Sequence, residues 1–465
     1  MANLETGRDA EPIRDKAELL EPFFAAFKPK EKFRIGAEAE KFGILERSLA
    51  PVAYEGDRGV VRVMTELSRD FGWRQVDVDP LLSLEKNGAS VTLEPGAQLE
   101  LSGAPLDDLH AVSDELRAHS AELATITERL REEIGEGIAW LGVGFHPLAR
   151  QEDLPWVPKP RYRFMREYLP TRGKNGLDMM RRTATVQANF DYDSEDAAMR
   201  SLRLTMRLSP IFTAIYANSP FYEGRLFGGK SYRAQVWLDV DPSRQGLVPA
   251  IFSRGASIES YVEWSLDAPM FMFLRGGKPV ANTGQTFRDF LANGFEGHRA
   301  IYGDWVTHLN SMFPEVRLKR TLEVRGGDSL GTRDVVGPAA LFTGLLYDAH
   351  AFEEAEALVG DFAHDELADL RPRVATDGLG AIFRGAPIRK LAERVLDLSK
   401  GGLQRRRRLR PDGRDESIHL EDTILRVEKG RSPADDLIDH VRSSLATGTP
   451  EREAVVAAVL ELSRV

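Results

Sequence analysis

The sequence predicts an α+β fold in which helices cover the apolar face of an antiparallel β-sheet. Several segments alternate between polar and apolar residues, as half-buried strands do, and others repeat apolar residues at helical spacing. With 42% hydrophobic residues among 465, the chain can bury a sizeable core. The alternating segments are 33–45, 91–102, 183–192, 231–240 and 317–326.

Helical periodicity and turn residues predict the remaining elements. Pro95-Gly96 interrupts the alternation within 91–102, so we expect a strand pair or one bulged strand there. Segment 151–175, rich in Pro, Arg and Tyr, predicts a long ordered loop around a short helix, and such loops are often functional. Helices are expected at 17–27, 106–134, 197–217, 341–358, 388–403 and 434–445, with a short strand at 140–145.

We expect one large domain over residues 33–403. A lead-in with one helix precedes it over 1–32, and a helical extension follows over 404–465. We find no internal repeat and no low-complexity linker between these parts.

Composition argues against several functional classes. The formal net charge of −10 argues against a general nucleic-acid binder, because phosphate backbones demand a basic surface. No apolar run approaches the length that spans a bilayer, so we expect no membrane partner. The chain has no cysteine, which rules out disulfides, thiolate catalysis and cysteine-bound zinc. Together with an acidic N-terminus that lacks a signal-peptide pattern, this composition leads us to expect a cytoplasmic protein.

The polar sides of four alternating segments carry carboxylates and amides. Side chains alternate with period two along a strand, so Glu38 and Glu40 point the same way, as do Gln98 and Glu100. A sheet face with this many acids would repel itself unless divalent cations or basic ligands lay on it. The other two segments add Gln187, Asn189 and Asp191, and Arg317, Lys319, Glu323 and Arg325.

This pattern predicts an enzyme that binds a magnesium–nucleotide complex on the sheet. Carboxylate and amide oxygens suit Mg²⁺ or Mn²⁺, and Mg²⁺ usually bridges to substrate phosphates instead of being enclosed by protein alone. Arg233, on the expected strand 231–240, and Arg325 project among the acids. Their guanidinium groups would offset the charge that develops on a transferring phosphoryl group.

Other motifs carry less weight in their context. Residues 224–231, GRLFGGKS, match the phosphate-loop pattern G-x-x-x-x-G-K-[ST]. Such a loop must follow a buried strand and open a helix, whereas here a helix and a proline turn precede it and a strand is expected after it. The four arginines 405–408 end an expected helix, where basic side chains favour the helix dipole. The nine histidines show no zinc-ligand spacing, although His146 follows a strand end and could line the site.

Several runs of the sequence closely resemble the plant-type glutamate–cysteine ligases, a family of plants and many bacteria with a glutamine-synthetase-like fold. The similarity extends in the same order from about residue 33 to 403, which would make that span the catalytic domain. The runs are RIGAEAEKFG, SVTLEPGAQLELSGAPLDDLH, GFHPLARQEDLPWVPKPRYRFMREYLP, GLDMMRRTATVQANFDY, ANSPFYEG and FPEVRLKRTLEVRGGDS.

The resemblance implies ATP-dependent joining of the γ-carboxylate of L-glutamate to the amine of L-cysteine through a γ-glutamyl phosphate, the first step of glutathione synthesis. It implies that Arg325 and Glu323 serve phosphoryl transfer and that Arg233 holds a substrate carboxylate in a bidentate fork. Arg161, Tyr162 and Tyr168 are further candidates for substrate contact. The implied Mg²⁺ ligands are Glu38, Glu40, Glu94, Glu100 and Glu323, with Gln187, Asn189 and Lys319 as cofactor-binding neighbours.

Three alternatives stay open at this point. A γ-glutamyl ligase with another amine acceptor would share these motifs, because we can identify no motif for the second substrate. A catalytically silent binding protein would be expected to lack the acids, yet all five are present. A phosphate-loop NTPase would depend on Lys230. We expect a monomer or weak homodimer that is not disulfide-linked.

The sequence departs from the resemblance at a few positions. Family members commonly carry cysteine at the position of Ala184 and again near Leu341, and some use such cysteines as a redox switch. A chain without cysteine cannot be regulated in this way. Ala97 stands where the family usually has a second glycine after LEPG, a change that we expect to be tolerated.

Overall fold

A nine-stranded antiparallel sheet forms the centre of the computed structural model, which describes residues 7–465. The strand order is β14-β15-β7-β1-β5-β4-β3-β2, and β6 pairs with the far end of β1. The strands are β1 (Ile35–Leu45), β2 (Arg74–Val78), β3 (Leu81–Lys86), β4 (Ala89–Leu93), β5 (Leu99–Ser102), β6 (Ile138–Leu141), β7 (Thr185–Phe190), β14 (Val316–Leu318) and β15 (Leu322–Asp328).

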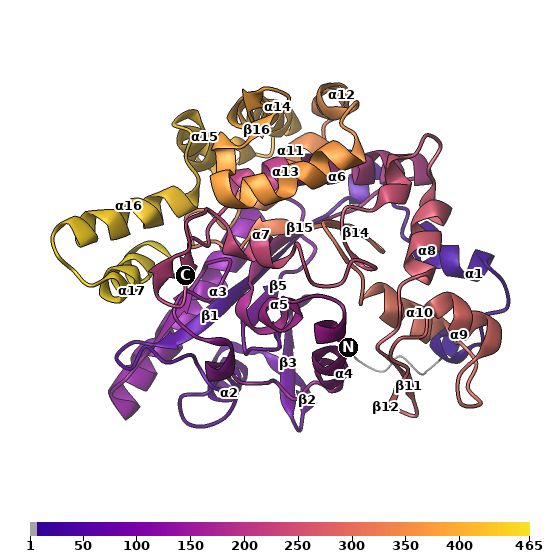
Figure 1. The fold of residues 1–465 in the computed structure, drawn as a ribbon, viewed down its shortest axis with the longest axis horizontal. Coiled ribbons are helices and arrows are strands. Elements are labelled where there is room, and N and C mark those ends of the chain that lie inside the picture. Colours follow the sequence, from indigo (N-terminus) through magenta and orange to yellow (C-terminus); the bar gives the residue numbers. More distant parts are fainter. Residues whose placement is uncertain (1–6) are drawn as a thin grey trace.

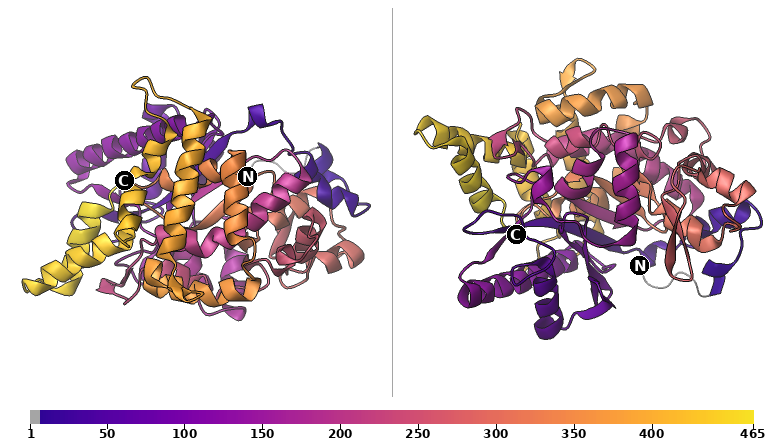
Figure 2. Two further views of the ribbon diagram at one scale, coloured as in Figure 1. Left: turned by 90° about the horizontal axis from the view of Figure 1, so that it is seen from above. Right: turned by 60° about the horizontal axis from the view of Figure 1, so that its bottom comes forward.

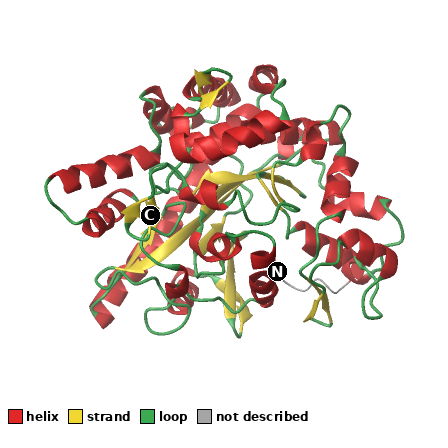
Figure 3. Cartoon of the chain, viewed as in Figure 1, coloured by secondary structure: helices red, strands yellow, loops and turns green. Residues whose placement is uncertain are grey.

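Helices surround the sheet (Figures 1 and 3). No helix within residues 7–465 is both long and apolar enough to cross a membrane. The helices are α1 (Ala17–Phe24), α2 (Val60–Phe71), α3 (Leu109–Ile134), α4 (Pro160–Tyr168), α5 (Gly176–Arg182), α6 (Glu195–Ile215), α7 (Tyr232–Val236), α8 (Ile258–Leu266), α9 (Phe287–Asn293), α10 (Tyr302–Leu309), α11 (Gly337–Leu346), α12 (Ala349–Val359), α13 (His364–Asp377), α14 (Arg389–Arg406), α15 (Glu421–Glu428), α16 (Pro433–Ala446) and α17 (Glu451–Leu462).

In the described part of the chain, four two-stranded sheets lie outside the central sheet. The pair β10 and β13 is parallel and the other three pairs are antiparallel. These strands are β8 (Phe221–Tyr222), β9 (Arg225–Leu226), β10 (Gln245–Gly246), β11 (Met272–Arg275), β12 (Lys278–Ala281), β13 (Phe313–Pro314), β16 (Ile382–Phe383) and β17 (Ala386–Pro387).

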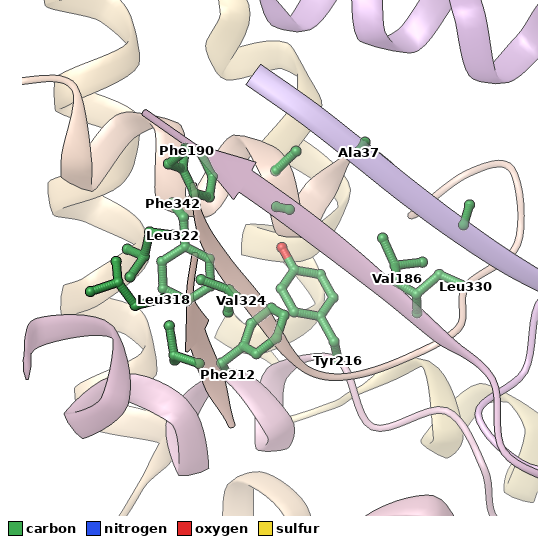
Figure 4. Close-up of a cluster of buried hydrophobic side chains, with 14 of the residues drawn as sticks. Ala37, Val186, Phe190, Phe212, Tyr216, Leu318, Leu322, Val324, Leu330 and Phe342 are labelled. Atoms are coloured by element: carbon green, nitrogen blue, oxygen red, sulfur yellow. The ribbon is translucent and has the colours of Figure 1, made fainter. Parts of the chain in front are cut away.

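The apolar face of the sheet packs on α6 and α11 (Figure 4). Phe212 of α6 and Phe342 of α11 meet edge to face with ring centroids 5.0 Å apart, and Phe190 of β7 lies against Phe342. Such aromatic pairs add to the free energy gained by burial alone. Small and branched side chains of the central strands fill the space beside the rings: Ala37, Val186, Leu322 and Val324. The predicted α+β fold class is confirmed.

Helix α3 runs along the same face of β1 and confirms the helix expected at 106–134. The carboxylate of Asp108 caps its first turn by accepting the backbone N–H of Ala111, and Gly135 ends it in a left-handed conformation with φ = 72°. Leu116, Leu123 and Leu130 are buried at helical spacing. The gap in this apolar stripe at His119 and Ser120 is also present, and His119 is buried.

The strand predicted at 231–240 is wrong. Residues Tyr232–Val236 form the short helix α7, whose first turn is capped by the Ser231 hydroxyl accepting the N–H of Ala234. Over five residues, alternation and helical spacing predict nearly the same apolar positions, so the pattern could not separate them.

The helix expected at 341–358 is two helices, α11 and α12. Asp348 divides it, because its carboxylate accepts the N–H of Ala351 and starts a new helix.

The predicted alternation of 91–102 is indeed interrupted, giving β4 and β5. The hairpin β2–β3 was not predicted. In the lead-in, α1 matches the expected helix, and residues 1–6 lie outside the described part of the chain.

Residues 404–465 fold back against the central sheet. A second apolar cluster joins Phe42 and Ile44 of β1 to Leu437 of α16 and Val459 of α17. The two views of Figure 2 show α16 and α17, in yellow, projecting together from this end of the molecule. The C-terminal helices therefore share a core with the strand that carries Glu38 and Glu40.

Ala97 lies between β4 and β5 with φ = 64°, in the left-handed region that a Cβ atom disfavours. We expect Ala97→Gly to leave the free energy of unfolding unchanged or to raise it by up to about 1 kcal/mol, because relief of this conformation offsets the chain entropy of glycine. Ala89→Gly is the control, since Ala89 is also buried but lies in a strand, where glycine should cost about 1 kcal/mol. Chemical denaturation measures both, and equal losses would contradict the prediction.

Candidate active site

The registers of four strands bring the predicted acids onto one face of the sheet. Glu40 on β1 lies directly opposite Glu100 on β5, and Glu38 lies opposite Gln187 on β7. Asn189 of β7 is opposite Glu323 on β15. Like charges directly opposite each other on neighbouring strands destabilise a sheet. This face therefore needs cations.

The carboxylates of Glu38, Glu40 and Glu100 have few donors of their own. Asn189 donates its amide to Glu38 at 2.8 Å, the backbone N–H of Thr185 donates to Glu40 at 3.0 Å, and the Thr92 hydroxyl donates to Glu100 at 2.6 Å. No ion pair to these three acids is found among residues 7–465. Glu40 also accepts a long hydrogen bond of 3.5 Å from the Gln187 amide, and one or two such bonds are little compensation for a buried charge.

The pKa values of these acids reflect this lack of compensation. Burial raises the pKa of Glu38 to about 8, and the charges of Glu323 and Glu100 add to the effect. Burial also raises the pKa of Glu40 and that of Glu100, and the nearby charge of Glu94 raises both further. Strongly shifted pKa values in a cluster are typical of functional sites.

Glu323 differs from the other acids because three cations surround it. Arg317 donates to both of its oxygens at 2.8 and 3.0 Å, Arg325 donates at 2.6 Å, and the Lys319 ammonium lies at 3.0 Å. Burial alone would raise the pKa of Glu323, but these three cations hold it well below its usual range. The carboxylate of Glu323 thus already has its counter-charges, and it fixes Arg325 in place.

Glu94 sits on the turn after β4, with about a quarter of its side chain exposed. The loop predicted at 151–175 approaches it, and this loop contains the expected short helix, α4. Tyr162 donates its hydroxyl to the Leu93 carbonyl at 3.0 Å and lies 3.4 Å from a Glu94 oxygen. Arg161 reaches to 4.0 Å from the same carboxylate. Tyr168, by contrast, packs on Phe271 and not on the acids.

Arg233 reaches the site from α7 and not from a strand. Its guanidinium donates to the carbonyls of Arg325 and Gly326 at 2.9 and 3.2 Å, while its Nε atom is buried with no hydrogen-bond partner. Arg233 and Arg325 both line one cavity beside the sheet, together with Trp237, Phe313, Glu315 and Arg371.

A buried carboxylate holds Arg233 in this position. Asp328, at the end of β15, accepts the hydroxyls of Ser219 and Ser231 at 2.6 and 2.8 Å and the backbone N–H of Asn218 at 2.7 Å. Ser231 caps α7, and the Ser219 hydroxyl accepts the backbone N–H of Arg233. Through these two serines, Asp328 therefore fixes both the start of α7 and the backbone of Arg233.

The arrangement of the acids suits a magnesium ion held by one or two carboxylates better than one enclosed entirely by protein ligands. Within residues 7–465, no three Asp, Glu or His side chains converge closely enough to hold a metal by themselves. Mg²⁺, however, is usually held by one or two carboxylates and completes its shell with water and substrate phosphates. The facing pair of Glu40 and Glu100 suits this mode, and the amide oxygen of Gln187, buried without a partner, offers another hard ligand.

Comparison with known proteins places these features in a family. The family model for glutamate-cysteine ligase family 2 (GCS2) matches residues 34–461. The chain is 40% identical over 433 residues to the chloroplastic glutamate–cysteine ligase of Brassica juncea, an alignment covering 92% of this chain and 81% of that protein. The chain belongs to glutamate–cysteine ligase family 2.

Further relatives show the same extent of similarity to this family 2 chain. Glutamate–cysteine ligase B, chloroplastic, of Oryza sativa subsp. japonica is 39% identical, with 92% of this chain and 84% of that protein covered. The Arabidopsis thaliana chloroplastic glutamate–cysteine ligase is also 39% identical, covering 92% and 80%. Among solved structures, the ligase PafA in its complex with Pup has a TM-score of 0.45 at 10% identity, covering 93% of this chain and 72% of that one, a likeness too weak to carry an argument.

The glycine-rich segment 224–231 does not have the geometry of a phosphate loop in this family 2 member. A helix does follow it, contrary to our expectation, but α7 has only five residues. Strand β8, just before the segment, forms a two-residue antiparallel pair with β9, which lies within the segment, so no buried parallel strand leads into it. Lys230 donates to Asp435 of α16 at 2.6 Å. Through this ion pair, the segment links the start of α7 to the C-terminal helix α16.

Sequence reasoning missed several residues of this family 2 site. Asp328 and Ser219 carried no local signal, because their partners lie far away in the sequence. Lys159, whose ammonium donates to the Leu93 carbonyl at 2.6 Å beside Glu94, was hidden within a loop rich in basic residues. Asp191 was expected beside Asn189, but it lies beyond β7 and binds Lys28 at 2.6 Å.

We expect Asp328→Asn to lower the free energy of unfolding by about 1–3 kcal/mol, because the new amide cannot accept all three buried donors. Chemical denaturation measures this loss, and turnover should fall with it as Arg233 shifts. Asp365→Asn is the control, since the Asp365 side chain is 99% exposed and its replacement should change stability by less than about 0.5 kcal/mol. Equal stability of the two variants would contradict the proposed anchoring role.

Proposed function

We propose that this protein joins L-glutamate to L-cysteine in an ATP-dependent reaction, through a γ-glutamyl phosphate, as the first step of glutathione synthesis. Family membership and relatives that bear the name glutamate–cysteine ligase support the proposal. The structural observation that carries it is the acid face of Glu38, Glu40, Glu94 and Glu100 beside Arg325. An ATP-dependent ligase needs such a face to hold the phosphates of the nucleotide.

We propose Mg²⁺, with Mn²⁺ as a substitute, as the metal held by Glu38, Glu40, Glu94 and Glu100. Bound there, the metal would bridge to the phosphates of ATP and neutralise their charge. The predicted ligand Glu323 is already paired with three cations, so its main role on this proposal is to hold Arg325. Asn189, which donates to Glu38, orients that carboxylate.

The basic residues of the site divide between the transferring phosphate and the substrates. Arg325 lies in the sheet face next to the acids, with only 13% of its side chain exposed. There its charge would stabilise the phosphoryl group as it transfers to the γ-carboxylate. Arg233 lines the same cavity as Arg325, and its buried Nε donor has no hydrogen-bond partner among the described residues, which suits Arg233 to hold a carboxylate of the substrate.

The acceptor amine would attack the γ-glutamyl phosphate, forming the amide bond and releasing phosphate. This reaction needs no protein thiol, and the chain has none. A disulfide can therefore neither regulate the enzyme nor link two copies. We propose a cytoplasmic monomer or weak homodimer.

The deciding experiment is ADP release by purified protein with ATP, Mg²⁺ and L-glutamate, across a panel of amines that includes L-cysteine. We expect strong turnover that depends on cysteine. Turnover that prefers another amine would overturn the assignment of the acceptor but keep the acyl-phosphate chemistry. No glutamate-dependent ADP release with any amine would overturn the proposal as a whole.

We expect Arg325→Ala to lower kcat by roughly 10²–10³-fold with little change in KM, because its contact is made mainly in the transition state. Glu323 keeps Arg317 and Lys319 in this variant, so the fold should persist. Steady-state kinetics measure the effect. Arg320→Ala is the matched control, since Arg320 is exposed in the turn between β14 and β15 and should stay within about twofold. An effect confined to KM would contradict this role.

We expect Mg²⁺ to stabilise the protein more at pH 8 than at pH 6. Folding raises the pKa of Glu38 to about 8 from an unfolded value of about 4.3, so without metal stability falls as pH rises through this range. The metal binds the deprotonated acids and must displace their protons at low pH. Thermal unfolding with and without Mg²⁺ measures the difference. Glu38→Gln should shrink it, and Glu85→Gln, at an exposed position on β3, should not. A magnesium effect independent of pH would contradict the prediction.

A further inference from the structure

A second cavity lies on the opposite face of β1 from the acids. It is enclosed by β1, by α3 and by the segment that leads into α11. Its free volume is about 20 Å³, which is room for one or two water-sized particles and too little for a metabolite. The polar side chains that line it are those of Lys41, Ser113, Arg117, His119, Ser120 and Thr332. Apart from Glu40, which also lines this cavity, none of the lining residues belongs to the site described above.

Lys41 is the charged group buried at this cavity. It follows Glu40 in β1, so its side chain points to the other face of the sheet, and it is only 2% exposed. Its ammonium group has three N–H donors, and in the described part of the chain one hydrogen bond is found, to the Ala39 carbonyl at 3.2 Å. A buried ammonium without a close counter-charge is costly.

His119 contributes a second buried polar group to the same cavity. It is 3% exposed, and neither of its ring nitrogens has a hydrogen-bond partner within residues 7–465. The nearest carboxylate, Glu122, lies 3.6 Å away and already accepts from Lys86 and Trp73. Burial lowers the pKa of His119 to about 4, so the ring is neutral and keeps one N–H donor.

The cavity therefore gathers donors without acceptors of matching charge. Lys41 and His119 offer buried N–H groups, the exposed Arg117 adds a guanidinium, and Ser113 offers a hydroxyl, whereas the Ser120 hydroxyl already donates to the Leu116 carbonyl at 3.0 Å. The one acidic side chain among the lining residues is Glu40, whose carboxylate accepts the backbone N–H of Thr185 on the other face of the sheet. The apolar residues that complete the wall and keep the local dielectric low are Ala39, Leu116, Leu330, Val335, Val336 and Val465.

We propose that this cavity binds one small monovalent anion, of about the size of chloride, between Lys41 and His119. The charge of Lys41 and the surplus of donors select an anion over water, and the free volume selects a small one. Bound there, the anion would tie β1 to α3 directly behind Glu40. The proposal does not depend on the proposed function.

Thermal unfolding of the full chain at constant ionic strength tests this site. Potassium gluconate serves as the baseline, because gluconate is too large for the cavity, and chloride, bromide, bicarbonate and sulfate replace it in turn. We expect the small monovalent anions to raise the melting temperature in a saturable way, by about 3 °C at 100 times the dissociation constant. Comparison of chloride with bicarbonate identifies the preferred anion, and sulfate should have no specific effect.

The variant Lys41→Met should abolish this anion-dependent rise, because it keeps the length of the side chain and removes the charge. Lys390→Met is the matched control, since Lys390 is exposed on α14 and the rise should remain. An unchanged rise in Lys41→Met, or an equal rise with sulfate, would overturn the proposal.

A direct measurement covers the case in which Lys41→Met does not fold. Crystals of the unmodified protein grown in bromide should show an anomalous peak in the cavity between Lys41 and His119. A cavity that holds only water under these conditions would overturn the proposal.

Discussion

The burial of several carboxylates on one face of a continuous sheet is the constraint on which the rest of this structure depends. The hydrogen-bond ladder between β1 and β5 holds Glu40 opposite Glu100, and the acids cannot move apart without breaking it. The protein neutralises one member of the group, Glu323, with three basic side chains. Glu38, Glu40 and Glu100 keep raised pKa values and, in the described part of the chain, have no ion-pair partner, so they are free to bind a metal cation that carries phosphates with it.

Rigidity of the opposite face makes this arrangement possible. Ala37 and Ala39 of β1 point into the apolar core between the acids of the same strand, and Phe212 and Phe342 pack against neighbouring strands. A tightly packed core resists the small displacements that would relieve repulsion between carboxylates. Lys41, on that same apolar face, is an exception to the pattern. Its burial behind Glu40 points to a second, anionic ligand on the far side of the strand.

Segments distant in the sequence complete the site around this sheet. Asp328 gathers Ser219 and Ser231 and so positions Arg233, about 95 residues away, and α4 brings Tyr162 to Glu94. The C-terminal helices share a core with β1 and bind Lys230 through Asp435. A site assembled from such parts depends on the whole fold, which is why we expect changes at Asp328 to affect stability and turnover together.

The sequence by itself determined the main strands, their polar and apolar faces and the identity of the acids, because alternation is a local property that a strand displays directly. It also determined the family, through motifs that extend over most of the chain. Only the tertiary structure decided that Arg233 lies on a helix, because five residues do not distinguish the two periods. Only the tertiary structure paired Glu323 with its three cations and left Glu38 and Glu40 without any. It also placed Lys41 and His119 at one cavity, because their proximity depends on how α3 packs on β1, and no local sequence pattern predicts that packing.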